Sequence, residues 1–446
     1  MEKEVRNLEI ELKNFSQEFL EKIKGRRLQV VSHFDTDGIT SARIMIGALK
    51  RLDQSFELKI VKNLTREFIS SLSKNKVTLF LDLASGSLKE IGESQLREVF
   101  IVDHHEIQGE IPQNVRILNP ELYDKRKISG AGMTYLFCKE IDEKNKEFAK
   151  FAVLGTIGDS LEKDLDSVNH GILEDSEVQR KKGILIYPST RPINRVLEYC
   201  SDPFIPGVTG NPEGVMELMR EINLSSNGSK CKSFMELDEE ETQRVVTAIM
   251  LRNPQVKNKE LLGELFLIKM FGKLEDAREI SAKINACSRN EETEIALRYC
   301  MEDNEAKKKA EAIHVKYKQQ LISGIKYAQE EAETIQGRGY VILNAKDKIK
   351  DTIIGTITSI LSHSAVYDKE TILIGMAYDK ERIKISARSV GQKGRNLREI
   401  LSSIMIGFDG EVGGHEFAAG CTIGKEYEKE FLKNLKQNLE LEVIRV

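Results

Sequence analysis

The stretch that decides the fold reads Val30-Val31-Ser32-His33-Phe34-Asp35-Thr36-Asp37-Gly38-Ile39-Thr40-Ser41. Its apolar start predicts a buried strand, and the helix-forming residues 41–49 that follow predict a turn into a helix. In an extended strand end alternate side chains share a face, so His33, Asp35 and Asp37 are expected to converge. An imidazole and two carboxylates aimed at one point, with Gly38 letting the backbone turn away, would hold a divalent cation. Taken alone, an acidic loop after a strand explains the stretch equally well.

Three further apolar segments end in charge, and all three are expected to be strand–ligand units. They span residues 77–82, 99–105 and 151–160. Strands that alternate with helices predict a parallel α/β sheet, whose site lies outside the carboxyl ends of its strands. All four charged clusters are expected at such ends. The candidate residues that share this location are His33, Asp35, Asp37, Asp82, Asp103, His104, His105 and Asp159.

Imidazoles and carboxylates together suit Mn²⁺, with Mg²⁺ or Fe²⁺ also conceivable. The set exceeds what one ion needs, which indicates two ions and a bridging carboxylate. Such a pair can activate a water and stabilise both oxygens of an in-line displacement, so phosphate-ester hydrolysis is the expected reaction. Taken singly, His104 and His105 could be surface residues and Asp82 a helix N-cap. Their joint occurrence at strand ends favours the site.

Composition bounds the class of protein. The 446 residues are 40% apolar and 31% charged, which suits a globular protein of two or three domains. The net charge of -4 gives no global basic field, so any contact with nucleic acid must come from a local patch. Six scattered cysteines without a CxxC pair, and no apolar run of membrane-spanning length, favour a reducing, cytoplasmic location.

The remaining segments predict an α/β protein with two globular parts. An amphipathic helix is expected within 1–27, strands at 28–31 and 55–60, and an acidic loop at 161–175. Residues 161–280 read as a mainly helical insertion, with helices near 214–222 and 238–250, and 302–334 as a connector helix. Strands are expected at 340–343, 371–378 and 382–387, with a helix at 352–362. The expected domains are therefore 1–300, with a parallel sheet, a connector at 301–335, and a smaller α/β domain at 336–446.

The ordered motifs resemble those of a known family. His33-Phe34-Asp35-Thr36-Asp37-Gly38, Asp82, Asp103-His104-His105 and Gly158-Asp159-Ser160 look like the four motifs of the DHH phosphoesterase superfamily. The segments Gly413-Gly414-His415 and Ala418-Ala419-Gly420 resemble the glycine-rich motif of its associated DHHA1 domain. Within the superfamily the chain is most similar to RecJ-like single-strand nucleases. The archaeal branch, whose members associate with the GINS replication complex or a repair helicase, is nearest in size.

The resemblance implies a role for each motif residue. His33 and Asp35 would hold one Mn²⁺, and Asp37, His104 and Asp159 the other, with Asp82 as the bridge. His105 would touch the scissile phosphate, and Asp103 would orient the histidines. The residues that would grip the substrate's phosphates are Ser386, Arg388, Gly413, Gly414 and His415.

The chain departs from the family pattern in two places. The segment Ile284-Asn285-Ala286-Cys287-Ser288-Arg289 carries Ser288 where RecJ-like chains have a second glycine, and Asn285 and Arg289 are kept as expected substrate contacts. No oligonucleotide-binding fold is recognisable after the DHHA1 part, unlike in long bacterial RecJ. For the glycine-rich motif, a tight turn with a structural His415 is the plainer alternative.

These observations predict a manganese-dependent exonuclease that releases mononucleotides from single-stranded DNA or RNA in replication or repair. Substrate is expected in a cleft between the two domains. One alternative is a nanoRNase or cyclic-dinucleotide phosphodiesterase, although such enzymes are usually shorter. Another is a replication scaffold with little activity, against which the intact ligand set argues. The resemblance implies a GINS or replicative helicase component, or a repair helicase, as partner.

Overall fold

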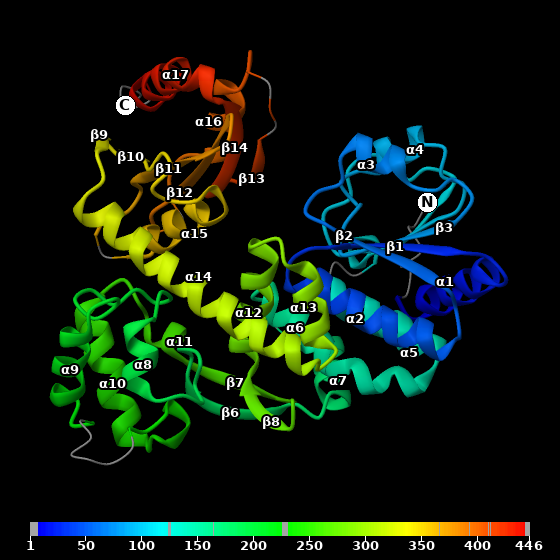
Figure 1. The fold of residues 1–446 in the computed structure, drawn as a ribbon, viewed down its shortest axis with the longest axis horizontal. Helices are drawn as coiled ribbons and strands as arrows, with labels where there is room; N and C mark the ends of the chain where they lie inside the picture. Colours follow the sequence, from blue (N-terminus) through cyan, green and yellow to red (C-terminus); the bar gives the residue numbers. More distant parts are fainter. Residues whose placement is uncertain are drawn as a thin grey trace, which may run out of the picture. The chain divides into compact units, whose positions relative to one another are not determined.

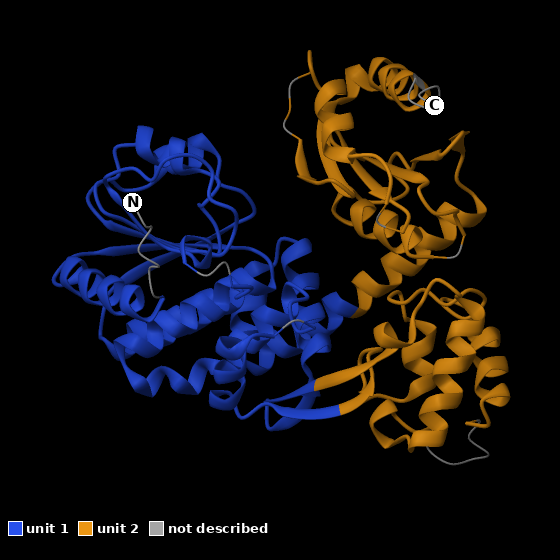
Figure 2. Ribbon diagram, turned by 180° about the vertical axis from the view of Figure 1, so that it is seen from behind, with its two compact units in different colours: residues 1–181, 266–314 blue, residues 182–265, 315–446 orange. Residues whose placement is uncertain are grey.

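The computed structural model describes residues 8–123, 126–163, 165–224, 231–364, 366–391, 393–408, 410 and 412–441. The chain divides into two compact units, coloured separately in Figure 2. Unit 1 consists of residues 1–181 and 266–314, and unit 2 of residues 182–265 and 315–446.

Unit 1 is built on a five-stranded sheet with the order β2-β1-β3-β4-β5. Strands β1, β2 and β3 of this sheet are labelled in Figure 1. Its strands are β1 (Leu28–His33), β2 (Phe56–Val61), β3 (Val77–Leu81), β4 (Val99–Val102) and β5 (Val115–Leu118). Every neighbouring pair is parallel, which confirms the predicted sheet. All residues of β3 and β4 are buried, as expected for strands covered on both faces.

The helices of unit 1 bury a large apolar core against this sheet. They are α1 (Leu8–Ile23), α2 (Thr36–Arg51), α3 (Arg66–Ser71), α4 (Leu88–Glu93), α5 (Gly130–Ile141), α6 (Ala149–Gly158), α7 (Ser167–Asp175), α12 (Ala277–Arg289) and α13 (Thr293–Cys300). Helices α2, α5 and α6 pack against one another. Phe15 and Phe19 of α1 each make edge-on ring contacts with Phe100 of β4 and Phe137 of α5, with centroids 5.1–5.4 Å apart.

Two predictions in this unit are wrong. Residues 151–157 belong to helix α6 rather than to a strand. Because α6 lies among α2, α5 and α12 and is buried nearly all round, its sequence lacks an amphipathic period and resembles a buried strand. Part of the expected acidic loop is helix α7, whose N-cap Asp166 accepts a hydrogen bond from the Asn169 N–H (2.9 Å).

Most of the predicted insertion is in unit 2, and the insertion contains the predicted helices and a small sheet that the sequence did not predict. Its helices are α8 (Ile193–Glu198), α9 (Pro212–Glu221), α10 (Glu239–Arg252) and α11 (Asn258–Leu261). The sheet has the order β6-β7-β8, and its strands are β6 (Gln179–Ile184), β7 (Leu262–Met270) and β8 (Lys273–Asp276). The sequence boundaries between the two units fall within β6 and within β7. A separate apolar core lies under these helices, with Val196, Leu218 and Val246 among its buried members.

The C-terminal part of unit 2 is a six-stranded mixed sheet with the order β13-β14-β12-β11-β10-β9. Its strands are β9 (Thr334–Gly337), β10 (Tyr340–Asn344), β11 (Ile372–Asp379), β12 (Arg382–Ser389), β13 (Gly413–His415) and β14 (Ala418–Gly424). Its helices are α15 (Asp351–Ser362), α16 (Leu397–Ile404) and α17 (Glu428–Leu441), and the predicted connector is α14 (Asn304–Glu330). Neighbouring residues of β11 enter different cores, since Ile372 packs with α16 and α17 and Leu373 with α14 and α15. Both faces of the sheet are therefore covered.

Short 3-10 helices occupy Pro120–Leu122, Glu143–Phe148, Phe234–Glu236 and Lys425–Tyr427. Among the described residues, no helix combines the length and the apolar character needed to cross a bilayer.

Candidate metal centre

The opening motif straddles the end of β1 and the start of α2. His33 is the last residue of β1, and Asp35 is the N-cap of α2, accepting a hydrogen bond from the Gly38 N–H (3.1 Å). Helix α2 begins at Thr36, so Asp37 lies in its first turn. The expectation that an extended strand end aligns these side chains is therefore wrong. An aspartate at the N-cap favours the helical turn, and the turn brings Asp37 back toward the sheet.

Asp82 follows β3 and stands between two histidines. One carboxylate oxygen, Oδ2, lies 3.4 Å from Nδ1 of His33, and the other, Oδ1, lies 3.4 Å from Nε2 of His104. Asp82 is 1% exposed, and its φ of 57° is left-handed, a conformation that few residues other than glycine adopt. Nδ1 of His33 also lies 3.0 Å from Oδ2 of Asp35.

A second group of side chains surrounds His104. Its Nε2 lies 3.1 Å from Oδ2 of Asp159 and 3.6 Å from Oδ2 of Asp37. Asp159 is the C-cap of α6, so a helix end carries this carboxylate into the group. The predicted position at a strand end is wrong for Asp159, but the predicted neighbours are present.

Asp103 is buried directly after β4 and organises both histidines. Its Oδ1 accepts hydrogen bonds from the N–H of His104 (2.8 Å) and of His105 (3.3 Å), and Nδ1 of His105 lies 2.7 Å from it. Its Oδ2 accepts a hydrogen bond from the Ser85 N–H (2.9 Å). The imidazole of His105 is half exposed and is held by one ring nitrogen, which leaves Nε2 for a ligand.

The N-terminus of α5 holds Asp37 in place, and sequence reasoning missed this contact. The N–H groups of Gly130 and Ala131 donate to Oδ2 and Oδ1 of Asp37, at 2.6 and 2.9 Å. A carboxylate at a helix N-terminus is favoured by the free N–H groups and the helix dipole. A Cβ on Gly130 would lie 2.6 Å from Oδ1 of Asp82, so only glycine fits there. The sequence signal that could have predicted this contact is the run Ser129-Gly130-Ala131-Gly132, in which Ser129 is the N-cap of α5.

Burial and crowding shift the pKa values of these groups. Burial raises the pKa of Asp82, and burial together with the charge of Asp82 raises that of Asp37. Burial lowers the pKa of His33, but Asp35 and Asp82 more than offset this and raise it to about 10. The pKa of His104 is raised in the same way, through Asp159 and Asp82. Without a cation, the cluster therefore retains protons at neutral pH.

The donor set fits divalent cations. His33, Asp35 and Asp82 form one group whose ligand atoms lie within 4.8 Å of one another, and Asp37, His104 and Asp159 form another. Within the described part of the chain, Oδ1 and Oδ2 of Asp82, Nδ1 of His33 and Nε2 of His104 are buried and lie 3.0–3.6 Å from their neighbours without a well-aligned hydrogen bond. Buried polar atoms are rarely left unsatisfied, and a metal ion would supply the missing interactions.

The residues expected to bind phosphate in the C-terminal part lie together in the sheet of unit 2. Nη1 of Arg388 donates to Oγ of Ser386 (3.1 Å), and both residues are on β12. Gly420 of β14 pairs with Ser386 on one side and with Gly413 of β13 on the other. His415 is exposed at the end of β13. This cluster is in unit 2, whereas the metal-ligand groups are in unit 1.

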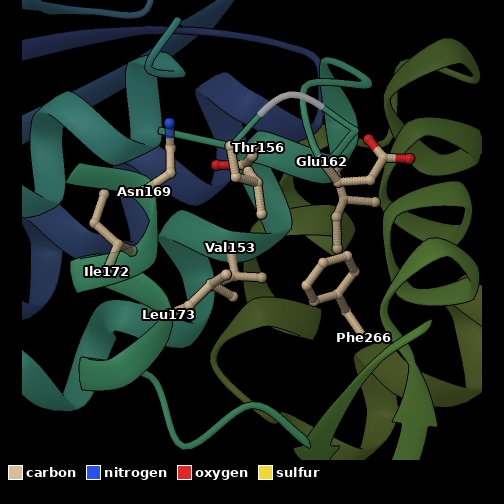
Figure 3. A pocket seen from close by; sticks show the side chains of 9 residues that line it. Val153, Thr156, Glu162, Asn169, Ile172, Leu173 and Phe266 are labelled. Atoms are coloured by element: carbon tan, nitrogen blue, oxygen red, sulfur yellow. The ribbon is translucent and has the colours of Figure 1, made fainter. Parts of the chain in front are cut away.

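The two remaining predicted contacts are on α12. Arg289 is exposed at the end of that helix, and Asn285 accepts a hydrogen bond from the N–H of Thr36 (3.1 Å). A separate small cavity, mostly apolar, lies beside α6 and α7 (Figure 3) and contains none of the predicted site residues. It is lined by Val153, Thr156, Ile157, Glu162, Leu165, Asn169, Ile172, Leu173 and Phe266.

Three domain families match the chain in order. Residues 27–156 match the DHH family, N-terminal domain; residues 186–259 match the DHH-CID domain; and residues 337–441 match the DHHA1 domain. An uncharacterised protein of Methanocaldococcus jannaschii is 28% identical over 430 residues, which are 92% of each chain.

Two further proteins share sequence or fold. The single-stranded-DNA-specific exonuclease RecJ of Thermus thermophilus is 28% identical over 153 residues, 30% of this chain and 23% of RecJ. Its structure in complex with Mn²⁺ has a TM-score of 0.60 at 19% identity, covering 96% of this chain and 54% of that one. Entamoeba histolytica CDC45 has a TM-score of 0.70 at 11% identity, covering 96% and 99%. Because the DHH and DHHA1 domains, the His/Asp cluster and the fold agree, the chain belongs to the DHH/DHHA1 phosphoesterase superfamily.

Proposed function

We propose that this protein is a manganese-dependent exonuclease that hydrolyses phosphodiester bonds in single-stranded DNA or RNA and releases mononucleotides. The observation that carries the proposal is the buried Asp82 carboxylate, which presents one oxygen to His33 and the other to His104. The sequence similarity to RecJ of T. thermophilus over the first domain supports the choice of single strands.

In this proposal each histidine group holds one cation. His33 and Asp35 would bind the first ion, and Asp37, His104 and Asp159 the second, with Asp82 shared between them. Mn²⁺ suits this mixture of nitrogen and carboxylate ligands, and Mg²⁺ would be a weaker substitute. Bound ions of this kind polarise phosphoryl oxygens and lower the pKa of water.

His105, oriented by the buried Asp103, would act on the substrate's phosphate. Asp103 raises the pKa of His105, while its own pKa is lowered by the bound imidazole against the opposing effect of burial. Asp103 therefore favours the protonated form of His105, whose Nε2 is the ring nitrogen that Asp103 does not contact. A protonated imidazole there would bind the scissile phosphate and donate to the departing oxygen.

In unit 2, Arg388 and the β13–β14 hairpin would bind phosphates further along the strand. The guanidinium can bind a phosphate bidentately, and glycine backbone N–H groups form a nest for anions. Gly414 has a φ of 112°, so its conformation suits glycine and not other residues.

Hydrolysis of a labelled single strand tests the proposal. Wild-type protein should release mononucleotides from strands of about twenty nucleotides in Mn²⁺ and none with a chelator present. Asp82→Asn should lose more than about 100-fold in rate, because it removes the shared ligand. Asp142→Asn is the matched control in the same unit, since asparagine caps a helix as well as aspartate does.

Equal hydrolysis with Mn²⁺ and with chelator, or full activity in Asp82→Asn, would contradict the proposal. Faster turnover of dinucleotides than of long strands would instead support a nanoRNase or cyclic-dinucleotide phosphodiesterase.

As a partner we propose a component of the replicative helicase, such as GINS, or a repair helicase. The similarity to the M. jannaschii protein along 92% of both chains supports a relation to the archaeal branch. Affinity capture of the purified candidates by the full chain tests this, and absence of binding to all of them would refute it.

A further inference from the structure

Helix α12 reaches the first turn of α2 from a segment about 250 residues further along the chain. Oδ1 of Asn285 accepts a hydrogen bond from the N–H of Thr36 (3.1 Å). The Thr36 hydroxyl donates to the carbonyl of Ser281 (3.1 Å), and Oγ of Ser281 donates to Oγ1 of Thr36 (3.2 Å). Thr36 is thus held by both its backbone and its side chain.

Thr36 stands between two of the candidate metal ligands, Asp35 and Asp37. It is 1% exposed and is the first residue of α2, so its N–H has no acceptor within the helix. The Asp35 carboxylate already accepts from Gly38. Without Asn285, the buried N–H of Thr36 would lose its hydrogen-bond partner. Thr36 sets the spacing of the Asp35 and Asp37 carboxylates, so the loss would fall at that point.

The helix that carries Asn285 is itself anchored in unit 1. Lys283, two residues earlier, has a side chain only 1% exposed, and its Nζ lies 2.8 Å from Glu275 and 3.5 Å from Glu279. Separating the buried Lys283 ammonium from its carboxylate partners would be strongly unfavourable, so these ion pairs hold α12 in one position. A rigid support of this kind can fix the helix start that carries Asp35 and Asp37.

We propose that Asn285 is a positioning residue of the metal centre: by holding Thr36, it sets the separation of Asp35 and Asp37 that divalent cations require. This inference rests on the proposed metal centre and differs from the expected contact of Asn285 with substrate. It needs only the amide oxygen of Asn285, whereas a substrate phosphate would need its amide N–H groups.

Mn²⁺ affinity of the full chain, measured by titration calorimetry without nucleic acid, tests the inference. Asn285→Ala should bind Mn²⁺ about tenfold more weakly or worse. Asn285→Asp, which keeps an acceptor, should restore the affinity. Asn290→Ala is the matched control, because Asn290 is a half-buried asparagine on the same helix end that donates to its own helix and not to Thr36.

A double-mutant cycle separates the hydrogen bond from the charge that Asn285→Asp adds. Thr36→Pro removes the N–H at a first-turn position where proline is tolerated, and Asp35 is already extended as a residue before proline must be. In that background, Asn285→Ala should weaken Mn²⁺ binding no further, whereas additive losses would overturn the inference.

Three other outcomes are decisive. Unchanged Mn²⁺ affinity in Asn285→Ala, with a raised KM for the strand, would overturn positioning and favour a substrate contact. Absence of Mn²⁺ binding by the wild type would overturn the proposed metal centre itself. Normal Mn²⁺ binding without hydrolysis would overturn only the proposed nuclease activity.

Discussion

At the residue scale, two buried aspartates show how differently a carboxylate can be used. Asp103 is fully buried but accepts hydrogen bonds from three backbone N–H groups. Asp82 is equally buried, but both of its oxygens lack a hydrogen-bond partner among the described residues, and its backbone is left-handed. Burial raises the pKa of Asp82 even though the imidazoles of His33 and His104 lie 3.4 Å from it, so its charge destabilises the metal-free chain and the residue is explained by metal binding.

Asp82→Asn should therefore stabilise the metal-free protein while it weakens Mn²⁺ binding. The amide carries no charge to desolvate, and asparagine adopts left-handed backbone readily, so we expect a gain of about 1 kcal/mol in the free energy of unfolding. Asp103→Asn should do the reverse and destabilise by roughly 1–3 kcal/mol, because it disturbs a satisfied network. Urea unfolding in the presence of a chelator measures both, and a loss of stability in Asp82→Asn would contradict this account.

The raised pKa of His33 makes metal binding depend on pH. Its pKa rises from 6.5 to about 10 on folding, so protonated His33 stabilises the metal-free protein fully below pH 6.5. That contribution is lost as the pH rises through about 10. A cation needs the neutral imidazole, so Mn²⁺ must displace the proton and its Kd should fall as the pH rises toward about 10. Calorimetry in two buffers of different ionisation enthalpy measures how many protons are released when Mn²⁺ binds. Binding without proton release would contradict the prediction.

At the element scale, glycines allow helices α5 and α6 to approach the carboxylates. A Cβ on Gly155 of α6 would lie 2.2 Å from Oδ1 of Asp37 and 2.5 Å from Cβ of Ala131. Glycine inside a helix is ordinarily unfavourable, so its presence in α6 has a packing reason. The close approach brings the C-terminus of α6, with Asp159, toward His104.

Replacing a glycine inside a helix with alanine usually stabilises a protein, but Gly155→Ala should have the opposite effect. We expect it to destabilise the protein by roughly 1–3 kcal/mol through overpacking and to weaken Mn²⁺ binding. Gly171→Ala on α7 is the control, because a Cβ there meets no atom within 4 Å, and it should stabilise by about 0.5–1 kcal/mol. Thermal unfolding of the two variants decides, and equal stabilisation of both would contradict the packing argument.

At the scale of the whole molecule, the candidate metal ligands all belong to unit 1. That unit is assembled from residues 1–181 and 266–314, and the second segment supplies α12. The candidate phosphate contacts Ser386 and Arg388 belong to unit 2. The proposed metal binding and the proposed strand binding would therefore depend on different units of the chain.

Mn²⁺ should accordingly protect amides in one unit only. At about a hundred times Kd, bound metal adds roughly 2.7 kcal/mol to the stability of the state that binds it. Hydrogen exchange with mass spectrometry should show slower exchange at residues 33–38 and 128–132, and none of this effect in β12. Asp82→Asn should abolish the protection, and equal protection in unit 2 would refute the assignment.

The sequence alone determined the parallel sheet, the α/β class of the C-terminal part and the connector helix, because alternation and apolar runs are local properties of the chain. Motif spacing also placed His33, Asp82 and His104 at neighbouring strand ends. Only the tertiary structure decided how Asp159 arrives, since the apolar run of residues 151–157 has no period that separates a buried helix from a strand. The hydrogen bonds from the N-terminus of α5 to Asp37, and from the N–H of Thr36 to Asn285, join residues that are 93 and 249 positions apart. Such contacts depend on how buried helices pack against one another, and local sequence patterns do not predict that packing.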